Sequence, residues 1–391
     1  MKKLNKCLIN KDCSSLPVWF MRQAGRYLPE FRKIRSKNQN FVELCLNSEL
    51  SSEITLQPLK RFNLDAAIIF SDILMVPYGL GQNLNFIKNE GPELSKFDLS
   101  IFLNNSKENF TKKLNPIYQA ISKTRKKLNQ EKSLICFVGS PWTLLFYMFN
   151  GKKNLNFIND KSVDLKIILE KLNEYLTLHI ENQFNAGADI VQIFDSWAGL
   201  IPEKNLSEYC YIPNQKLVEH CKKINLPVIC FPKGIKKKYK EFLEIVKPNG
   251  INIDYDIDPI WAKDNLTNVC LQGGMSPKIL LEDEKLELVA DEQMRKFRSN
   301  VSNNGKTMRQ GLWSYSRHPN YLGEILFWWG LYFMTISIDI NYWYLFVCPL
   351  IMNLMFSLIT CQMMDNRSLE RRTDYADYMK STRQLIIWRS N

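Results

Sequence analysis

Short β-prone runs alternate with segments of helical periodicity along the first 290 residues. The runs lie at Val18–Phe20, Ala66–Ile73, Leu134–Val138, Asp189–Phe194, Val228–Phe231, Ile251–Asp254 and Val269–Gln272. Between them, the clearest helical segment is Asp164 to Phe184, whose apolar residues recur every three or four positions. This alternation predicts parallel βαβ units with right-handed crossovers, since each helix must return the chain to the same edge of the sheet.

Eight such units would close a TIM (β/α)8 barrel, whose active site lies at the carboxyl ends of the strands. We count seven runs, so the sequence predicts an α/β fold of TIM type that lacks its last strand. No G-x-G-x-x-G follows the first run, which disfavours a dinucleotide-binding sheet.

The composition narrows the class of partner. The net charge of +12 favours an anionic partner, but the basic residues are scattered apart from one cluster, Lys233 to Lys240. Such a cluster is more often a solvated helix face than a nucleic-acid site, so we expect no nucleic-acid partner. Ten cysteines occur without any C-x-x-C pair, which favours reduced thiols in a cytoplasmic domain and no metal.

Polar residues follow four of the predicted strands. They are Arg22, Arg26 and, further along, Arg35 after the first run, Asp72 after the second, Tyr147 after the third and Ser196 after the fourth. A guanidinium binds a carboxylate through two parallel hydrogen bonds, and an aspartate ending an apolar strand must find donors or lose its charge. Singly, Asp72 could be a helix N-cap and the arginines a solvated loop. Together they predict one polar face at the strand ends.

Five stretches of the chain resemble the uroporphyrinogen decarboxylase family: Pro17–Arg32, Phe62–Leu74, Gly139–Leu144, Gln192–Gly199 and Leu271–Gly274. The resemblance implies a (β/α)8 barrel that is typically a homodimer. It also implies removal of the four acetate carboxyls of uroporphyrinogen III as CO2, giving coproporphyrinogen III in haem biosynthesis, without metal or organic cofactor.

The resemblance also assigns roles to these residues. Asp72 matches the position that accepts the pyrrole N–H groups, and it would stabilise the cationic ring formed during decarboxylation. Arg22, Arg26 and Arg35 match arginines that bind substrate carboxylates, and Arg22 could take part in proton delivery. The two remaining positions, which contact substrate carboxylates, are matched by Tyr147 and Ser196.

The chain departs from this family at its C-terminal side. The family ends with an eighth strand and a Gly-His-Gly turn whose histidine lines the cleft, whereas this chain has only His179, His220 and His318, none of them in such a turn. An open barrel leaves strand edges unpaired and lacks part of the substrate wall. We therefore expect the barrel to be destabilised and either weakly active or inactive.

The last hundred residues predict an α-helical membrane hairpin. Trp343 to Met364 is 22 residues without a charged side chain, long enough for a span, and Ile325 to Ile338 adds 14 more. Basic residues flank the outer ends but not the connection near Asp339, so we expect both ends to face the cytoplasm, together with the barrel.

This segment resembles the C-terminal part of the DUF1295 family, related to steroid 5α-reductases and isoprenylcysteine methyltransferases. The resemblance is carried by Arg317-His318-Pro319-Asn320-Tyr321 and by Glu324. It implies that Arg317, His318, Asn320, Tyr321 and Glu324 derive from a binding region for NADPH or S-adenosylmethionine. The family's earlier spans are absent, so we expect no independent reductase activity.

We expect one domain at residues 1–290 and a second at 291–391, joined near Glu284 to Glu292 as an in-frame fusion. One alternative is a membrane-bound NADPH-dependent reductase or S-adenosylmethionine-dependent methyltransferase fragment with a vestigial barrel. Another is a corrinoid- or zinc-dependent methyltransferase, but the adjacent His220 and Cys221 do not supply the spacing of a zinc site.

Overall fold

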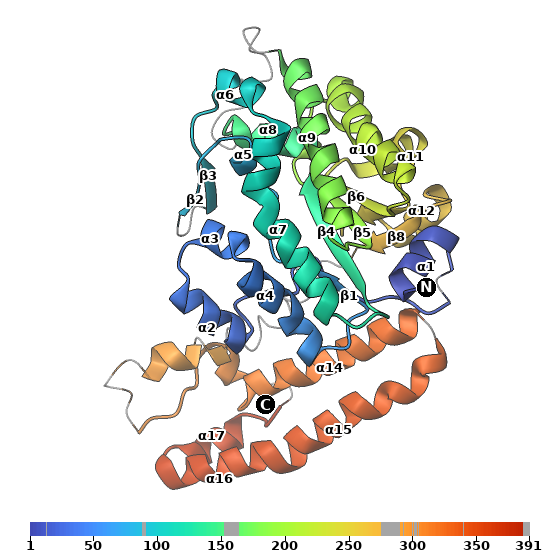
Figure 1. Cartoon of the computed structure of the whole chain (residues 1–391). Coiled ribbons are helices and arrows are strands. Elements are labelled where there is room, and N and C mark those ends of the chain that lie inside the picture. Colours follow the sequence, from blue (N-terminus) through green and yellow to red (C-terminus); the bar gives the residue numbers. More distant parts are fainter. Residues whose placement is uncertain are drawn as a thin grey trace. The chain divides into compact units, whose positions relative to one another are not determined.

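The computed structural model describes all residues except 13, 88–90, 152–163, 275–289, 292, 299, 301–302, 304, 339 and 386–391. The chain forms two compact units, Met1–Gly274 and Met275–Asn391, each described here by itself. Figure 1 shows both units as a ribbon whose colours follow the sequence from the N-terminus to the C-terminus.

The first unit is built on a parallel sheet of six strands in the order β1-β4-β5-β6-β7-β8 (Figure 1). The strands are β1 (Ala66–Ile68), β4 (Ser133–Gly139), β5 (Ile190–Asp195), β6 (Val228–Pro232), β7 (Gly250–Ile253) and β8 (Cys270–Gly273). Each strand pairs with the previous strand of this sheet, as right-handed βαβ crossovers require. The α/β prediction is therefore confirmed, as a curled half-barrel.

Residues that alternate along each strand enter two different cores. On one side, Ile135 of β4 packs with Ile190 of β5 and Ile229 of β6; on the other side, Leu134 joins the larger core beneath the helices. The inner core also contains Leu8 of α1 (Lys3–Asn10). Ion pairs from Lys2 to Asp189 and from Lys3 to Asp65 hold α1 at the amino ends of the strands, which leaves the carboxyl ends for a site.

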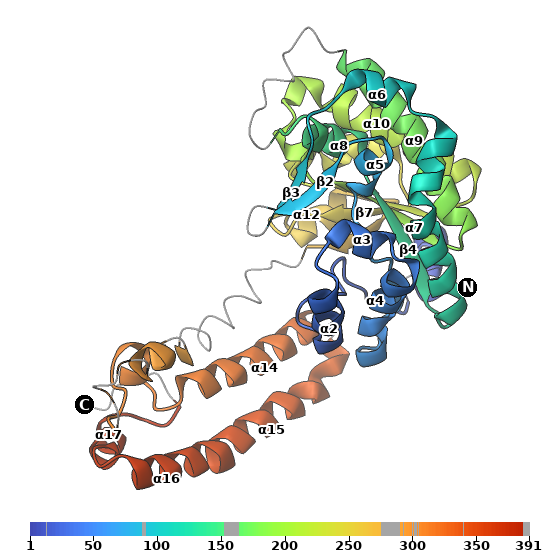
Figure 2. The ribbon, with the colours of Figure 1, turned by 60° about the vertical axis from the view of Figure 1, so that its left-hand side comes forward.

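Helices pack against the sheet or against one another. They are α2 (Pro29–Lys37), α3 (Phe41–Leu46), α4 (Ser48–Arg61), α5 (Met75–Gly79), α6 (Leu99–Asn104), α7 (Lys107–Lys127), α8 (Pro141–Met148), α9 (Leu165–Asn185), α10 (Ile212–Lys223), α11 (Tyr239–Val246) and α12 (Pro259–Asn265). One-turn helices η2 (Ala198–Leu200), η3 (Glu203–Asn205), η4 (Ser207–Tyr211) and η5 (Lys236–Lys238) lie in the loops after β5 and β6. An antiparallel hairpin, β2 (Leu84–Ile87) with β3 (Gly91–Leu94), follows α5 and contacts α3 and α8 (Figure 2).

The prediction of a strand at Val18–Phe20 is wrong. This segment is extended but forms one backbone hydrogen bond with the sheet, from the Asp65 N–H to the Val18 carbonyl (2.9 Å). The Val18 N–H donates to the Asp65 carboxylate (2.8 Å), so it cannot also pair with the backbone of a neighbouring strand. Pro17 has no N–H to offer. We call residues 17–23 the strap.

The second unit is helical, and its helices α14 (Pro319–Ile338) and α15 (Val347–Met355) run side by side (Figure 2). Its helices are η7 (Gly311–Ser314), α14 (Pro319–Ile338), η8 (Ile340–Phe346), α15 (Val347–Met355), η9 (Phe356–Thr360), α16 (Cys361–Arg371) and α17 (Tyr375–Ser381). Among the described helices, one stretch, Ile340–Arg371, is long and apolar enough to cross a membrane, and only 17% of its most apolar window is buried. Thus one candidate span, rather than a complete hairpin, meets the requirement of length and composition.

Candidate active site

Hydrogen bonds hold the arginine loop onto the first strand. Gln23 is buried, and its side-chain N–H donates to the Ala66 carbonyl of β1 (2.9 Å). The Tyr27 hydroxyl in turn donates to the Gln23 carbonyl. Arg22 and Arg26 lie in this loop with exposed side chains, and within the described part of the chain neither guanidinium has a recorded hydrogen bond or ion pair. Two cationic groups are thus available to an anionic ligand.

Asp72 lies beyond the carboxyl end of β1, in a turn that enters α5. Its Oδ1 accepts the Leu74 N–H (2.8 Å) and so uses one carboxylate oxygen. The alternative that Asp72 is a helix N-cap is wrong, because Leu74 is the N-cap of α5 and the Asp72 bond closes the turn before it. Burial raises the pKa of this carboxyl from 3.8 to about 6, and the Leu74 hydrogen bond and the charge of Arg22 oppose that rise. The side chain is nevertheless half-buried rather than enclosed, so Oδ2 remains available to a ligand.

Tyr147 shares an electrostatic environment with Arg22 and Asp72. It lies on α8, which begins after the Ser140 side chain accepts the Thr143 N–H. Burial raises the pKa of the Tyr147 phenol; among the further causes, the charge of Asp72 raises it and that of Arg22 lowers it. Because the effect of one charge on another weakens with distance and is largely screened by salt beyond about 10 Å, the three groups lie in one region of the strand-end face.

Two of the predicted residues have less direct support. Ser196 directly follows β5 and is half-buried, with no recorded hydrogen bond of its hydroxyl in the described structure. Arg35 lies on α2, and its guanidinium donates to the Asn38 and Gln39 carbonyls while lying 5.7 Å from the centre of the Phe41 ring. Arg35 therefore braces the end of its own helix.

The sequence did not assign a role to Asp195, the last residue of β5. Its side chain is buried and accepts hydrogen bonds from the Thr143 hydroxyl (2.8 Å) and the Asn214 amide (3.1 Å). Burial raises the pKa of this carboxyl, and its hydrogen-bond donors oppose the rise. Asp195 thus ties β5 to α8 and α10, which fixes the backbone that carries Ser196.

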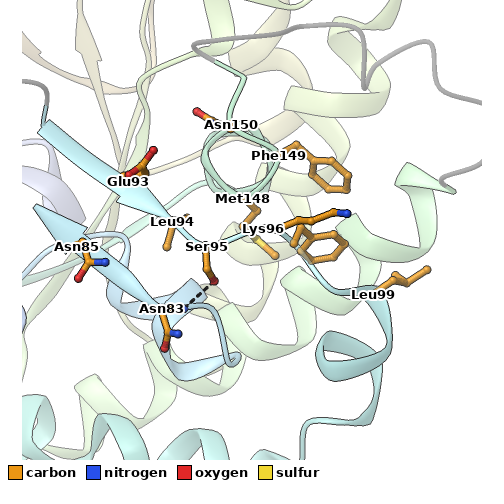
Figure 3. A pocket seen from close by; sticks show the side chains of 11 residues that line it. Asn83, Asn85, Glu93, Leu94, Ser95, Lys96, Leu99, Met148, Phe149 and Asn150 are labelled. Carbon is orange, nitrogen blue, oxygen red and sulfur yellow. Dashed lines mark hydrogen bonds between the residues drawn. The ribbon is translucent and has the colours of Figure 1, made fainter. Parts of the chain in front are cut away.

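A cavity of about 780 Å3 lies between the β2–β3 hairpin and the end of α8 (Figure 3). Its lining mixes apolar side chains such as Phe149 with the polar Glu93 and Lys96, and none of the predicted substrate-binding residues belongs to it. The convergence of charged groups, rather than cavity size, therefore identifies the candidate site near Asp72.

In the second unit, four of the five residues predicted to contact a cofactor line one cavity of about 530 Å3. They are Arg317, His318, Asn320 and Tyr321; Glu324 is not among the lining residues. Both Arg317 (2.8 Å) and His318 (2.8 Å) contact the buried carboxylate of Asp365, to which the Tyr375 hydroxyl also donates. Two of the motif's side chains therefore stabilise the fold of this unit.

The remaining histidines of the barrel unit do not form a metal centre. His179 is buried on α9 and bonds to the Tyr118 hydroxyl (2.9 Å), and burial lowers its pKa to about 3, which makes it a neutral core residue. His220 faces Glu181 at 3.9 Å. Over the described ranges, no three His, Cys, Asp or Glu side chains are grouped to hold a metal ion.

Two family models match the chain. Residues 1–305 match uroporphyrinogen decarboxylase (URO-D), and residues 268–382 match a protein family of unknown function, DUF1295. The two matches overlap at 268–305, around the end of the first compact unit.

Relatives of known name agree with the first match. The uroporphyrinogen decarboxylase of Orientia tsutsugamushi (strain Ikeda) is 41% identical over 313 residues, covering 78% of this chain and 90% of that protein. The enzyme of the same name from Rickettsia bellii (strain RML369-C) is 41% identical over 278 residues, covering 69% and 82%. These matches do not favour a reductase or methyltransferase with a vestigial barrel.

A methyltransferase from Methanosarcina mazei has a similar structure, with a TM-score of 0.52 over 70% of this chain and 92% of that one. At 16% identity this likeness shows the fold alone. The match to the uroporphyrinogen decarboxylase model covers residues 1–305, which is more than half of the chain. It includes Arg22, Asp72 and Tyr147, which act on one another electrostatically in the structure. The chain belongs to the uroporphyrinogen decarboxylase family.

Proposed function

We propose that this protein decarboxylates the acetate side chains of uroporphyrinogen III to give coproporphyrinogen III. One observation carries the proposal: Asp72, half-buried and with one carboxylate oxygen uncommitted, shares its environment with Arg22 and Tyr147 at the strand ends. A macrocycle with inward-facing pyrrole N–H groups and peripheral carboxylates needs a central acceptor surrounded by cationic donors. The site offers both kinds of group.

Each residue has a role in this scheme. Asp72 accepts the pyrrole N–H groups, and Arg22 and Arg26 bind substrate carboxylates. Tyr147 and Ser196 each donate one further hydrogen bond to a carboxylate. A hydrogen bond to a charged group contributes roughly 1.5–3 kcal/mol, so two arginines suffice to select a polycarboxylate. Arg35 would act on the substrate only after exchanging its contacts with Asn38 and Gln39, so we assign it a weaker part.

The chemistry requires an electron sink rather than a cofactor. Protonation of a pyrrole carbon makes the ring cationic, the C–C bond to the acetate carboxylate then breaks with its electron pair passing into the ring, and CO2 leaves. Protonation of the exocyclic carbon and loss of the added proton from the ring carbon finally restore the pyrrole, so that one proton is consumed for each CO2 released. Asp72, ionised, stabilises the ring cation electrostatically, which is commonly the largest catalytic term. The charge of Arg22 acts on the Asp72 carboxyl, so Arg22 lies near enough to assist the proton transfer. A guanidinium is nevertheless a poor acid.

We also propose that the chain has two functional parts, a decarboxylase domain at residues 1–290 and a membrane segment at residues 291–391. It is supported by the two compact units and the two family matches. The stretch Ile340–Arg371 would anchor the chain in the cytoplasmic membrane, leaving the barrel in the cytoplasm. The exposed side chains of Phe20, of Leu200 after β5 and of Tyr255 after β7 support a homodimer in which a second copy covers them.

The full chain, purified in detergent and assayed anaerobically, should convert uroporphyrinogen III to coproporphyrinogen III, measured as the oxidised porphyrins by liquid chromatography. Arg22→Gln should raise KM by at least tenfold, because it removes a charge-assisted hydrogen bond. Lys33→Gln is the matched control, since it removes one exposed positive charge on the adjacent α2. Absence of product from the unaltered chain, or equal KM changes in both variants, would contradict the proposal.

A further inference from the structure

The strap that leads into the arginine loop bridges the two edges of the open sheet. On the β1 side it has three hydrogen bonds: the Val18 N–H and Val18 carbonyl bond to Asp65, and the Gln23 amide bonds to the Ala66 carbonyl. On the β8 side, within the described residues, it has one: the Trp19 indole N–H donates to Gln272 Oε1 (3.0 Å). The strap therefore has a single described hydrogen bond at the far edge, from an indole that also packs against the inner core.

Gln272 is itself fixed from the interior of the half-barrel. Its Nε2 donates to Asn252 Oδ1 (3.0 Å) and lies 3.5 Å from Gln192 Oε1. Both of these amides are buried, on β7 and β5 respectively. The donor end of Gln272 thus points toward the sheet and its acceptor end toward Trp19, so the orientation of the amide is determined.

Backbone geometry at the next residue favours the same arrangement. Gly273 has φ +84°, and a Cβ there would lie 2.8 Å from the amide of Asn252. A larger residue would displace the partner that orients Gln272.

We propose that Gln272 is a positioning residue for Arg22, the substrate-binding arginine of the strap. Arg22 follows Trp19 by three residues in the same strap, so the indole contact limits how far the arginine end can swing away from the face that carries Asp72. Without it, the strap is hydrogen-bonded at one edge only, and Arg22 samples a wider range of positions. This inference rests on the proposed function for its kinetic consequence, but not for its structural one.

The test compares Gln272→Leu, Trp19→Phe and the double variant in the full chain. Each single variant removes the same hydrogen bond, so we expect KM for uroporphyrinogen III to rise roughly fivefold in each, with kcat nearly unchanged. The double variant should raise KM no further than Trp19→Phe alone, because the two substitutions remove the same hydrogen bond. Amide hydrogen exchange of residues 19–28 should accelerate in all three.

Gln82→Leu is the matched control. Gln82 is a buried amide that donates to the Ser95 (2.9 Å) and Met148 (3.3 Å) carbonyls, away from the strap. Its loss should lower thermal stability without altering KM or exchange at residues 19–28. Additive effects of Trp19→Phe and Gln272→Leu, or unchanged exchange in the strap, would overturn the inference. If the unaltered chain makes no product, the proposed function fails, and the exchange measurement alone decides the role of Gln272.

Discussion

Replacing Asp72 with asparagine should stabilise the folded protein while abolishing decarboxylation. Asparagine keeps an oxygen that accepts the Leu74 N–H, so the turn into α5 survives. What it removes is a carboxylate whose burial raises its pKa to about 6. A group whose charge the fold disfavours but the reaction requires is a site where stability and activity oppose each other.

The size of the effect follows from that pKa. The difference between 3.8 and about 6 is roughly two pH units, or about 3 kcal/mol. Solvent contact of the half-buried side chain reduces this to about 1–3 kcal/mol. Between these two pH values the folded state binds more protons than the unfolded state, so stability falls as pH rises through this window and stays lower above it. The gain in Asp72→Asn should be largest above pH 7 and vanish near pH 4.

Urea unfolding of the full chain in detergent, followed by tryptophan fluorescence at pH 4.5, 6 and 7.5, measures this difference. Asp258→Asn is the matched control, because Asp258 is exposed and its Oδ1 likewise accepts an N–H two residues ahead, from Ile260 (2.9 Å). That control should show no comparable gain. A neutral or destabilising Asp72→Asn at pH 7.5, or a gain that does not change with pH, would refute the reasoning.

Three other outcomes are expected. The kcat/KM of the unaltered chain should decline below about pH 6 as Asp72 becomes protonated, and a pH profile flat from 5 to 8 would contradict an ionised Asp72. Asp365→Asn should destabilise the second unit by about 3 kcal/mol in thermal unfolding, since it leaves Arg317 without its buried counter-ion. Leu354→Arg should weaken insertion into lipid vesicles by roughly 2.5–3.5 kcal/mol, whereas Leu369→Arg, near the end of the candidate span, should matter less; equal effects would argue against a span.

The sheet could be predicted from sequence because its strands are continuous apolar runs. Leu134–Val138 and Val228–Phe231 match β4 and β6 to within about a residue at each end. The predicted run Ala66–Ile73 is longer than the strand, because β1 ends at Ile68 and the Phe70 N–H donates to the Thr55 hydroxyl (2.9 Å) of α4. Periodicity cannot reveal that a side chain takes over a backbone donor.

The site was predictable only in part, for a similar reason. Residues following strands could be grouped because parallel strands end on one face, and this brought Asp72 and Tyr147 together. The hydrogen bonds from the Arg35 guanidinium to the Asn38 and Gln39 carbonyls depend on the backbone conformation at the end of α2, which the sequence pattern does not specify. The contact between Trp19 and Gln272 joins residues 253 positions apart, which no local pattern encodes.

The strand order has a consequence for how the barrel unit assembles during synthesis. Because each strand of the sheet from β4 to β8 pairs with the one made before it, the sheet can grow outward from β1 as the chain emerges. Its newest edge remains available to stray strands until the next strand of the sheet is made and pairs with it. Ribosome-bound intermediates stalled after β6 or β7 are therefore where a chaperone should be needed most.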